Sequence, residues 1–79
     1  MTQDLRAEVN RLIGMILERP VSASENPSRA SEPNWDSLKH AELVFLVEDH
    51  FGVRFSEQDL ARINDSEQLT RLVEERLAP

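Results

Sequence analysis

The stretch Asn34-Trp35-Asp36-Ser37-Leu38 separates a polar segment from the most apolar part of this 79-residue chain. Eight of the fourteen residues from Leu38 to Phe51 are apolar, a density that predicts a helix enclosed by other helices. Asp and Ser are typical of helix N-termini, because their side-chain oxygens accept hydrogen bonds from the unpartnered backbone N–H groups of the first turn. The stretch therefore predicts a central helix over 37–51, with Gly52 as its C-terminal stop.

A serine at the start of a helix is also a favourable place to attach a phosphate group. The free backbone N–H groups and the helix dipole favour phosphate oxygens at that end, so a phosphodiester on Ser37 has a physical rationale. The need for a helix cap accounts for the same residue without any chemistry. Ser37 and His40 are three residues apart, but no orienting group or oxyanion donor accompanies them, so no nucleophile–base pair is predicted.

The segment before this stretch divides into a helix and a loop. Residues 3–18 carry apolar side chains at helical spacing, namely Leu5, Val9, Leu12, Ile13, Ile16 and Leu17. Thr2 is the predicted N-cap, Gly14 the predicted site of a close helix crossing, and Pro20 the predicted end. The polar loop over 19–36 is rich in Pro and Ser, and its part over 20–34 offers only Val21 as an apolar anchor, so we expect that part to be poorly ordered.

Two further helices are predicted after the central one. Val53-Arg54-Phe55 alternates apolar and polar residues, but no second strand is available, so we expect an extended connector whose apolar side chains pack inward. Capping boxes at Ser56 to Asp59 and at Asp65 to Gln68 introduce a short helix over 56–62 and a longer one over 66–77. The prediction is an all-α fold, a small antiparallel bundle of three main helices and one short one, in a single domain over 1–79.

Composition narrows the class of function. The net charge of −6 disfavours nucleic-acid binding, which needs Lys and Arg against phosphates, and favours partners with basic surfaces. There is no Cys, and the two His have no ligand spacing, so we predict no metal site. With no apolar run of membrane-spanning length and no signal peptide at its own Met, we expect a complete, monomeric, cytoplasmic protein without membrane attachment. We also predict that it is not an enzyme.

Beyond these patterns, the chain resembles acyl carrier proteins over most of its length. The resemblance is carried by Asp36-Ser37-Leu38, by Ala41-Glu42-Leu43-Val44, by the run from Val47 to Val53, and by Phe55 with the run from Ser56 to Leu60. The tripeptide alone is common. Together with its place at the start of the central helix and the short helix that follows, it is specific to that family.

The resemblance implies a site and a cofactor. Ser37 would be esterified by 4′-phosphopantetheine, donated from coenzyme A by a phosphopantetheinyl transferase, and Asp36 would help to place the metal ion in the transferase complex. The arm would hold acyl or aminoacyl groups as thioesters. Leu38, Glu42, Glu48 and Asp49 would meet the basic docking patches of acyl-loading and acyl-processing enzymes. The interior, which shelters an acyl chain in some members, would be formed by Leu43, Val44, Leu46, Val47, Leu60, Ile63 and Leu69.

Some positions depart from the family pattern. Asn34 stands where Gly is usual, and Lys39 follows Leu38 where carriers of fatty-acid synthesis often have an acid, although a Lys in the first turn opposes the helix dipole. These departures favour a discrete carrier of polyketide, nonribosomal or other specialised biosynthesis over the general carrier of fatty-acid synthesis. Two alternatives remain. One is a carrier-like domain that is never modified and acts as a regulatory or structural subunit. The other is an unrelated acidic helical adaptor that binds a partner helix in an exposed apolar groove.

Overall fold

The computed structural model describes the backbone of residues 2–77 and the side chains of residues 4–77. It contains four helices, α1 (Thr2–Leu17), α2 (Ser37–Phe51), α3 (Glu57–Arg62) and α4 (Ser66–Leu77). Within the described residues no strand forms, and the only β-type pairing is an isolated bridge between Ser28 and Asp65. The predicted all-α class and the four helices are therefore confirmed, while the predicted starts of the first and third helices each differ by one residue.

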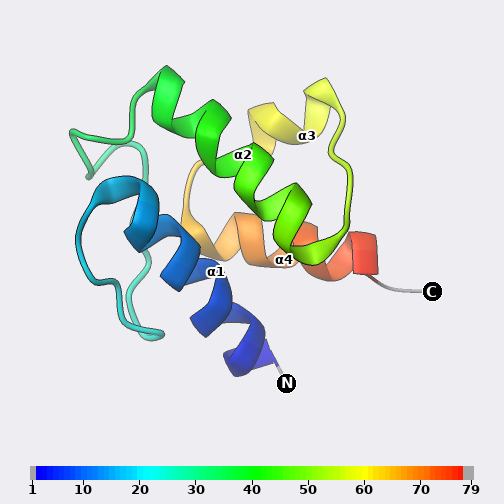
Figure 1. The fold of residues 1–79 in the computed structure, drawn as a ribbon, viewed down its shortest axis with the longest axis horizontal. Helices are drawn as coiled ribbons and strands as arrows, with labels where there is room; N and C mark the ends of the chain where they lie inside the picture. The colour runs from blue at the N-terminus through cyan, green and yellow to red at the C-terminus, as the bar shows by residue number, and fades with distance from the viewer. Residues whose placement is uncertain (1, 78–79) are drawn as a thin grey trace.

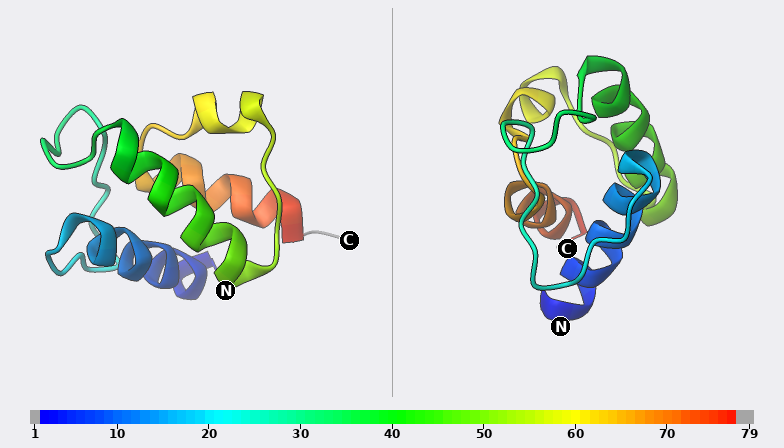
Figure 2. Two further views of the ribbon diagram at one scale, coloured as in Figure 1. Left: turned by 45° about the horizontal axis from the view of Figure 1, so that its top comes forward. Right: turned by 90° about the vertical axis from the view of Figure 1, so that its left-hand side faces the viewer.

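The four helices surround one core (Figure 1). α1 and α2 run antiparallel, and α4 packs against α1 while it crosses behind α2. The short α3 lies on the other side of α2 from α1 in Figure 1, and both views of Figure 2 show it above α4. This arrangement leaves the start of α2 at one end of the molecule, next to the long loop that follows α1.

The core is built from the apolar stripe of each main helix. α1 and α4 have the spacing of an amphipathic helix, so each directs one row of side chains inward. The buried apolar side chains are Val9, Leu12, Ile13, Leu17, Trp35, Leu43, Val44, Val47, Ile63, Leu69, Leu72 and Val73, and Val53 is buried nearby. The expected inward packing of Val53 and Phe55 is confirmed, because Phe55 also packs against this cluster.

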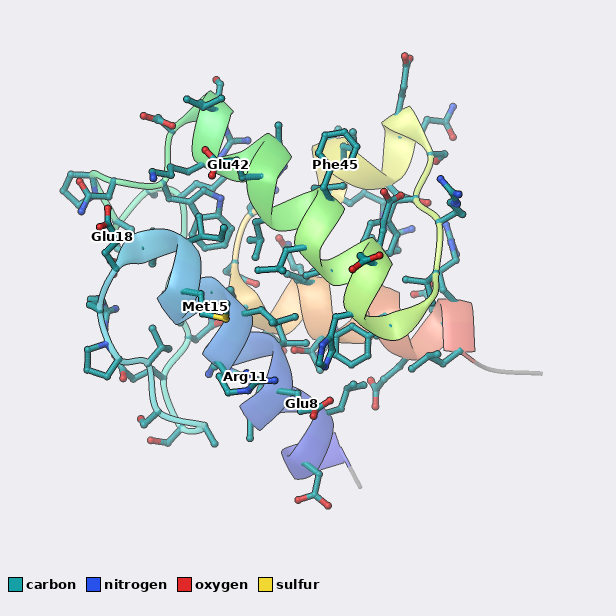
Figure 3. All side chains as sticks on the ribbon, in the orientation of Figure 1. Glu8, Arg11, Met15, Glu18, Glu42 and Phe45 are labelled. Carbon is teal, nitrogen blue, oxygen red and sulfur yellow. The ribbon has the colours of Figure 1, made fainter. Side chains whose placement is uncertain are left out.

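The prediction that other helices enclose the apolar side chains of α2 is wrong for two of them. Leu38 is 68% exposed and Phe45 is 70% exposed, although both belong to the apolar run of this helix. The reason is size, because a domain of this length has too few elements to cover every face of its central helix. One face of α2 is therefore both apolar and open to solvent (Figure 3).

The loop between α1 and α2, expected to be poorly ordered over 20–34, makes long-range polar contacts in the structure. The guanidinium of Arg19 donates to both carboxylate oxygens of Glu32, over 3.2 and 3.0 Å, and to Glu25 over 3.1 Å. Backbone hydrogen bonds join the loop to the segment before α4, from Arg29 N–H to the Asn64 carbonyl and from Ser66 N–H to the Pro27 carbonyl. Long-range polar contacts therefore fix a segment that has few apolar anchors.

The ends of the helices follow from particular residues. α1 ends at Leu17, and Glu18 adopts a positive φ of 60° that turns the chain back. Gly14 serves that turn and not a helix crossing, because a Cβ there would lie 2.6 Å from the Arg19 carbonyl oxygen. Gly52 ends α2 in the left-handed region, as predicted. The predicted cap at Thr2 falls on a side chain outside the described residues. Over the part of the chain that is described, no helix has both the length and the apolar character needed to cross a membrane.

Candidate functional site

The start of α2 is built around Asp36. This residue is the N-cap, with an extended backbone, and its Oδ1 accepts a hydrogen bond of 2.9 Å from the Lys39 N–H. The Asp36 carbonyl accepts the first helical hydrogen bond, from the His40 N–H over 2.8 Å. Asp36 thus satisfies the orphan donor of Lys39, which is the ordinary role of an acidic cap.

Ser37 is the first residue of the helix, and its side chain is exposed. The cap function is performed by Asp36, so it does not require the Ser37 hydroxyl. Among the described residues, no side-chain hydrogen bond involves that hydroxyl. The Ser37 oxygen is therefore an accessible nucleophile position at the positive end of a helix dipole.

A surface groove of about 280 Å³ has Ser37 in its lining and lies between α2 on one side and Phe55 and α3 on the other. Its lining is mainly apolar: Ser37, His40, Ala41, Val44, Phe45, Glu48, Phe55 and Leu60. Phe55 and Leu60 are partly buried against the core, so this wall of the groove is continuous with the interior. The groove offers an apolar surface directly beside the exposed hydroxyl.

His40 is occupied by other partners and is not paired with Ser37. Its Nδ1 accepts a hydrogen bond of 3.1 Å from the indole N–H of Trp35, and its Nε2 lies 3.3 Å from the carbonyl oxygen of Leu60. Burial, as the largest cause, lowers the pKa of His40, and the charge of Arg29 lowers it further, while the Leu60 hydrogen bond opposes both. Since both ring nitrogens are engaged, His40 cannot act as a general base for Ser37 in this arrangement.

Of the residues predicted for partner recognition, Leu38, Glu42 and Asp49 are exposed on α2. Glu48 is different, because its Oε2 accepts a hydrogen bond of 2.8 Å from the Phe55 N–H. It therefore fixes the connector after α2 and is only partly exposed.

Phe45 is the residue that sequence reasoning missed. It belongs to the apolar run for which the sequence predicts enclosure, yet its side chain is 70% exposed and projects outward with that of Glu42 in Figure 3. The spacing of Leu38, Glu42, Phe45 and Asp49, at i, i+4, i+7 and i+11, places all four on one helical face. That spacing could have shown that this face combines apolar and acidic side chains.

The residues predicted to form an acyl-chain interior have two different positions. Leu43, Val47, Ile63 and Leu69 belong to the closed core, where plain packing explains them. Val44 and Leu60 line the groove as well as contacting the core, and Leu46 packs against the core while partly exposed. Only Val44 and Leu60 of this set therefore meet the surface beside Ser37.

The short α3 is held in place by Asp59. Its carboxylate accepts from the Ser56 N–H over 2.9 Å in the predicted capping box, and it forms an ion pair with Arg76 of α4. The Ser56 N–H and then Arg76 lower the pKa of Asp59 below its ordinary value. This pair ties the α3 wall of the groove to the end of α4.

Comparison with known proteins adds nothing to these observations. No protein-family model matches the chain, and no curated protein matches it significantly. Within the described residues, no cluster of three or more His, Asp or Glu side chains is placed to hold a metal ion. The functional assignment therefore depends on the chemistry of the site.

Proposed function

We propose that this chain is a carrier protein modified on Ser37 by 4′-phosphopantetheine. The observation that supports the proposal best is the exposed Ser37 at the first position of α2, with the cap function already performed by Asp36. A phosphodiester there would be stabilised by the helix dipole and by the backbone N–H groups of the first turn. An apolar groove that has Ser37 in its lining suits a flexible arm attached to this residue.

The residues around Ser37 fit this cofactor. When bound, the cofactor supplies the thiol that this Cys-free chain lacks. Asp36 uses Oδ1 for the Lys39 N–H and is exposed, so its carboxylate is accessible for placing a metal ion in a complex with the transferase. Val44, Phe55 and Leu60 offer the groove wall against which an apolar cargo would pack.

Partner enzymes would dock on the exposed face of α2. Glu42 and Asp49 complement basic patches, and such exposed charges raise the association rate more than the affinity, which suits a protein that must release its partners. Phe45 adds exposed apolar area between these two acids, and Leu38 adds more one turn before Glu42. We propose a role in specialised biosynthesis, on the basis of the departures at Asn34 and Lys39, with general fatty-acid synthesis as the alternative pathway.

Intact mass spectrometry tests the proposal. The chain is incubated with coenzyme A, Mg²⁺ and a broad-specificity phosphopantetheinyl transferase, in parallel with Ser37→Ala and with Ser31→Ala, an exposed serine of the loop. We expect the mass of one phosphopantetheine to be added to the wild type and to Ser31→Ala, but not to Ser37→Ala. Absence of the addition with several transferases, while the chain remains folded by circular dichroism, would reject the carrier function.

Acylation assays test the pathway. The modified chain is offered to loading enzymes of fatty-acid synthesis and of polyketide or nonribosomal assembly in parallel. We expect loading by an enzyme of the second class to be faster. Equally fast loading by the fatty-acid enzymes would contradict the specialised assignment and leave the carrier function intact.

One observation favours a second candidate, an unmodified helical adaptor. A helical adaptor requires an apolar groove that is open to a partner helix, and the groove between α2 and α3 is apolar and open. Phe45, which lines this groove, is exposed. An adaptor gives no role to an exposed serine at the helix start. If Ser37 accepts no cofactor, a partner that binds this groove becomes the better explanation.

A further inference from the structure

His40 joins three segments that are separate in sequence. It lies in the first turn of α2, it accepts a hydrogen bond from the indole of Trp35 in the preceding loop, and its Nε2 contacts the Leu60 carbonyl in α3. An indole N–H can only donate and a carbonyl oxygen can only accept. The two contacts together therefore require a neutral imidazole that carries its proton on Nε2.

The same contacts place His40 beside Ser37. His40 and Leu60 both line the groove that has Ser37 in its lining, on its two sides. Trp35 precedes the cap residue Asp36 and is only 3% exposed, so its indole is held in the core next to this groove. The Trp35 and His40 rings are tilted by only 31° with centroids 6.2 Å apart, which fits an edge-to-edge hydrogen bond and not a stacked pair.

We propose that His40 is a pH-sensitive connection, in which the neutral side chain holds Trp35 and α3 together and its protonation opens the groove beside Ser37. An imidazolium carries N–H groups on both nitrogens. Its Nδ1–H would face the N–H of Trp35, so the hydrogen bond is lost and two donors oppose each other. The contact that joins α2 to Trp35 beside the groove is thereby weakened.

The charged groups around His40 favour its neutral imidazole at neutral pH. Arg29 of the loop opposes a positive charge on His40. On α2, the Glu48 carboxylate that lines the groove accepts from the Phe55 N–H, and the Asp36 carboxylate accepts from the Lys39 N–H. From α3, none of the groove-lining side chains in the described part of the chain is titratable, and Asp59 is paired with Arg76.

The direction of the pH effect follows from these surroundings. Burial and Arg29 lower the pKa of His40 below the ordinary value of about 6.5. The contribution of neutral His40 to stability is therefore complete above about pH 6.5 and is lost as the pH falls through the lowered value. The device requires only side chains of this chain, so it does not depend on modification of Ser37.

The only tryptophan gives a direct measurement. The chain has one Trp and no Tyr, so its fluorescence reports Trp35 alone. We expect one transition in the emission of the unmodified chain between pH 8 and pH 4.5, with its midpoint below 6.5 and at constant far-ultraviolet circular dichroism. His50→Gln should retain this transition, because His50 contacts Glu8 at the opposite end of α2, and His40→Gln should abolish it.

Nitrogen-15 NMR of the wild type tests the same inference without a variant. We expect the Nε2–H tautomer of His40 at pH 7.5, and changes in the Trp35 Nε1–H and Leu60 amide signals at the midpoint of His40. The amide of Leu69, in the core, should not follow them. Any one of three results would overturn the proposal. They are a Nδ1–H tautomer of His40, a fluorescence transition that persists in His40→Gln, and Trp35 signals that do not change as His40 titrates.

Discussion

The hydroxyl of Ser66, the first residue of α4, donates a hydrogen bond to the side-chain oxygen of Asn10 in the middle of α1. Both side chains are fully buried. The amide nitrogen of Asn10 donates in turn to the carbonyls of Ser22 and Glu25, over 2.7 and 3.0 Å. A single buried asparagine therefore joins α1, the long loop and α4, and every polar atom of its side chain is paired.

Asn10→Ala should destabilise the fold strongly. The substitution removes three hydrogen bonds and leaves the buried Ser66 hydroxyl without its partner, while the Ser22 carbonyl keeps the Glu25 N–H and the Glu25 carbonyl keeps the Arg6 guanidinium. A buried unpaired group costs about 1–3 kcal/mol, and each lost hydrogen bond costs about 0.5–1.5 kcal/mol. We expect the free energy of unfolding to fall by roughly 2–4 kcal/mol, measured by urea denaturation followed by circular dichroism. Asn34→Ala, at an exposed position in the same loop, should change it by less than about 0.5 kcal/mol. Similar losses in the two variants would contradict this role of Asn10.

Asp59→Asn should weaken the fold in a pH-dependent way. Asn retains an acceptor for the Ser56 N–H but loses the charge that pairs with Arg76, so we expect a loss of about 1–2 kcal/mol at pH 7. Because the pKa of Asp59 is lowered in the folded state, its contribution is complete above the unfolded value of about 3.9 and is lost as the pH falls through the folded value. Urea denaturation at pH 7 and at pH 3 should show the difference from wild type shrinking at the lower pH. Asp49→Asn, at an exposed position, should change the free energy of unfolding at pH 7 by less than about 0.5 kcal/mol.

The sequence predicted the helices because each depends on local signals. Ser56 and Asp59 form their capping box over three residues, and Gly52 ends α2 through its own backbone. The order of the loop was not predictable in this way. It depends on Arg19 reaching Glu32 and on Asn10 reaching Ser22, contacts between residues more than ten positions apart that leave no periodic pattern.

The candidate site likewise has residues that local sequence signals predicted and contacts that they did not. Asp36 and Ser37 were recognised from their position before an apolar run, and Asp36 is the observed cap. The exposure of Phe45 was missed because hydrophobicity alone does not tell which faces of α2 the other helices cover. The His40 contacts depend on how α3 folds back against α2, so no spacing in the sequence could predict them.

Phe45→Ala should separate partner binding from stability. Because the side chain is 70% exposed, we expect the free energy of unfolding to change by less than about 0.5 kcal/mol. If the proposed docking face is used, kcat/KM for modification of Ser37 by the transferase should fall roughly 5–30-fold, as expected for an exposed aromatic anchor worth 1–2 kcal/mol. Met15→Ala removes a 57% exposed side chain from α1 and should leave kcat/KM unchanged. Equal effects of both variants would exclude a specific role for Phe45.

Gly14→Ala tests why a glycine interrupts the apolar pattern of α1. In an unconstrained helix interior this substitution stabilises by about 1 kcal/mol, because Ala is the better helix former. In this structure the new Cβ would lie 2.6 Å from the Arg19 carbonyl oxygen, a backbone atom that cannot move without disturbing the turn at Glu18. We therefore expect a net loss of roughly 1–3 kcal/mol in urea denaturation, typical of overpacking. Ala7→Gly, at an exposed position of the same helix, should cost only about 1 kcal/mol through helix propensity. A more stable Gly14→Ala variant would show that the chain after α1 does not turn back against this residue.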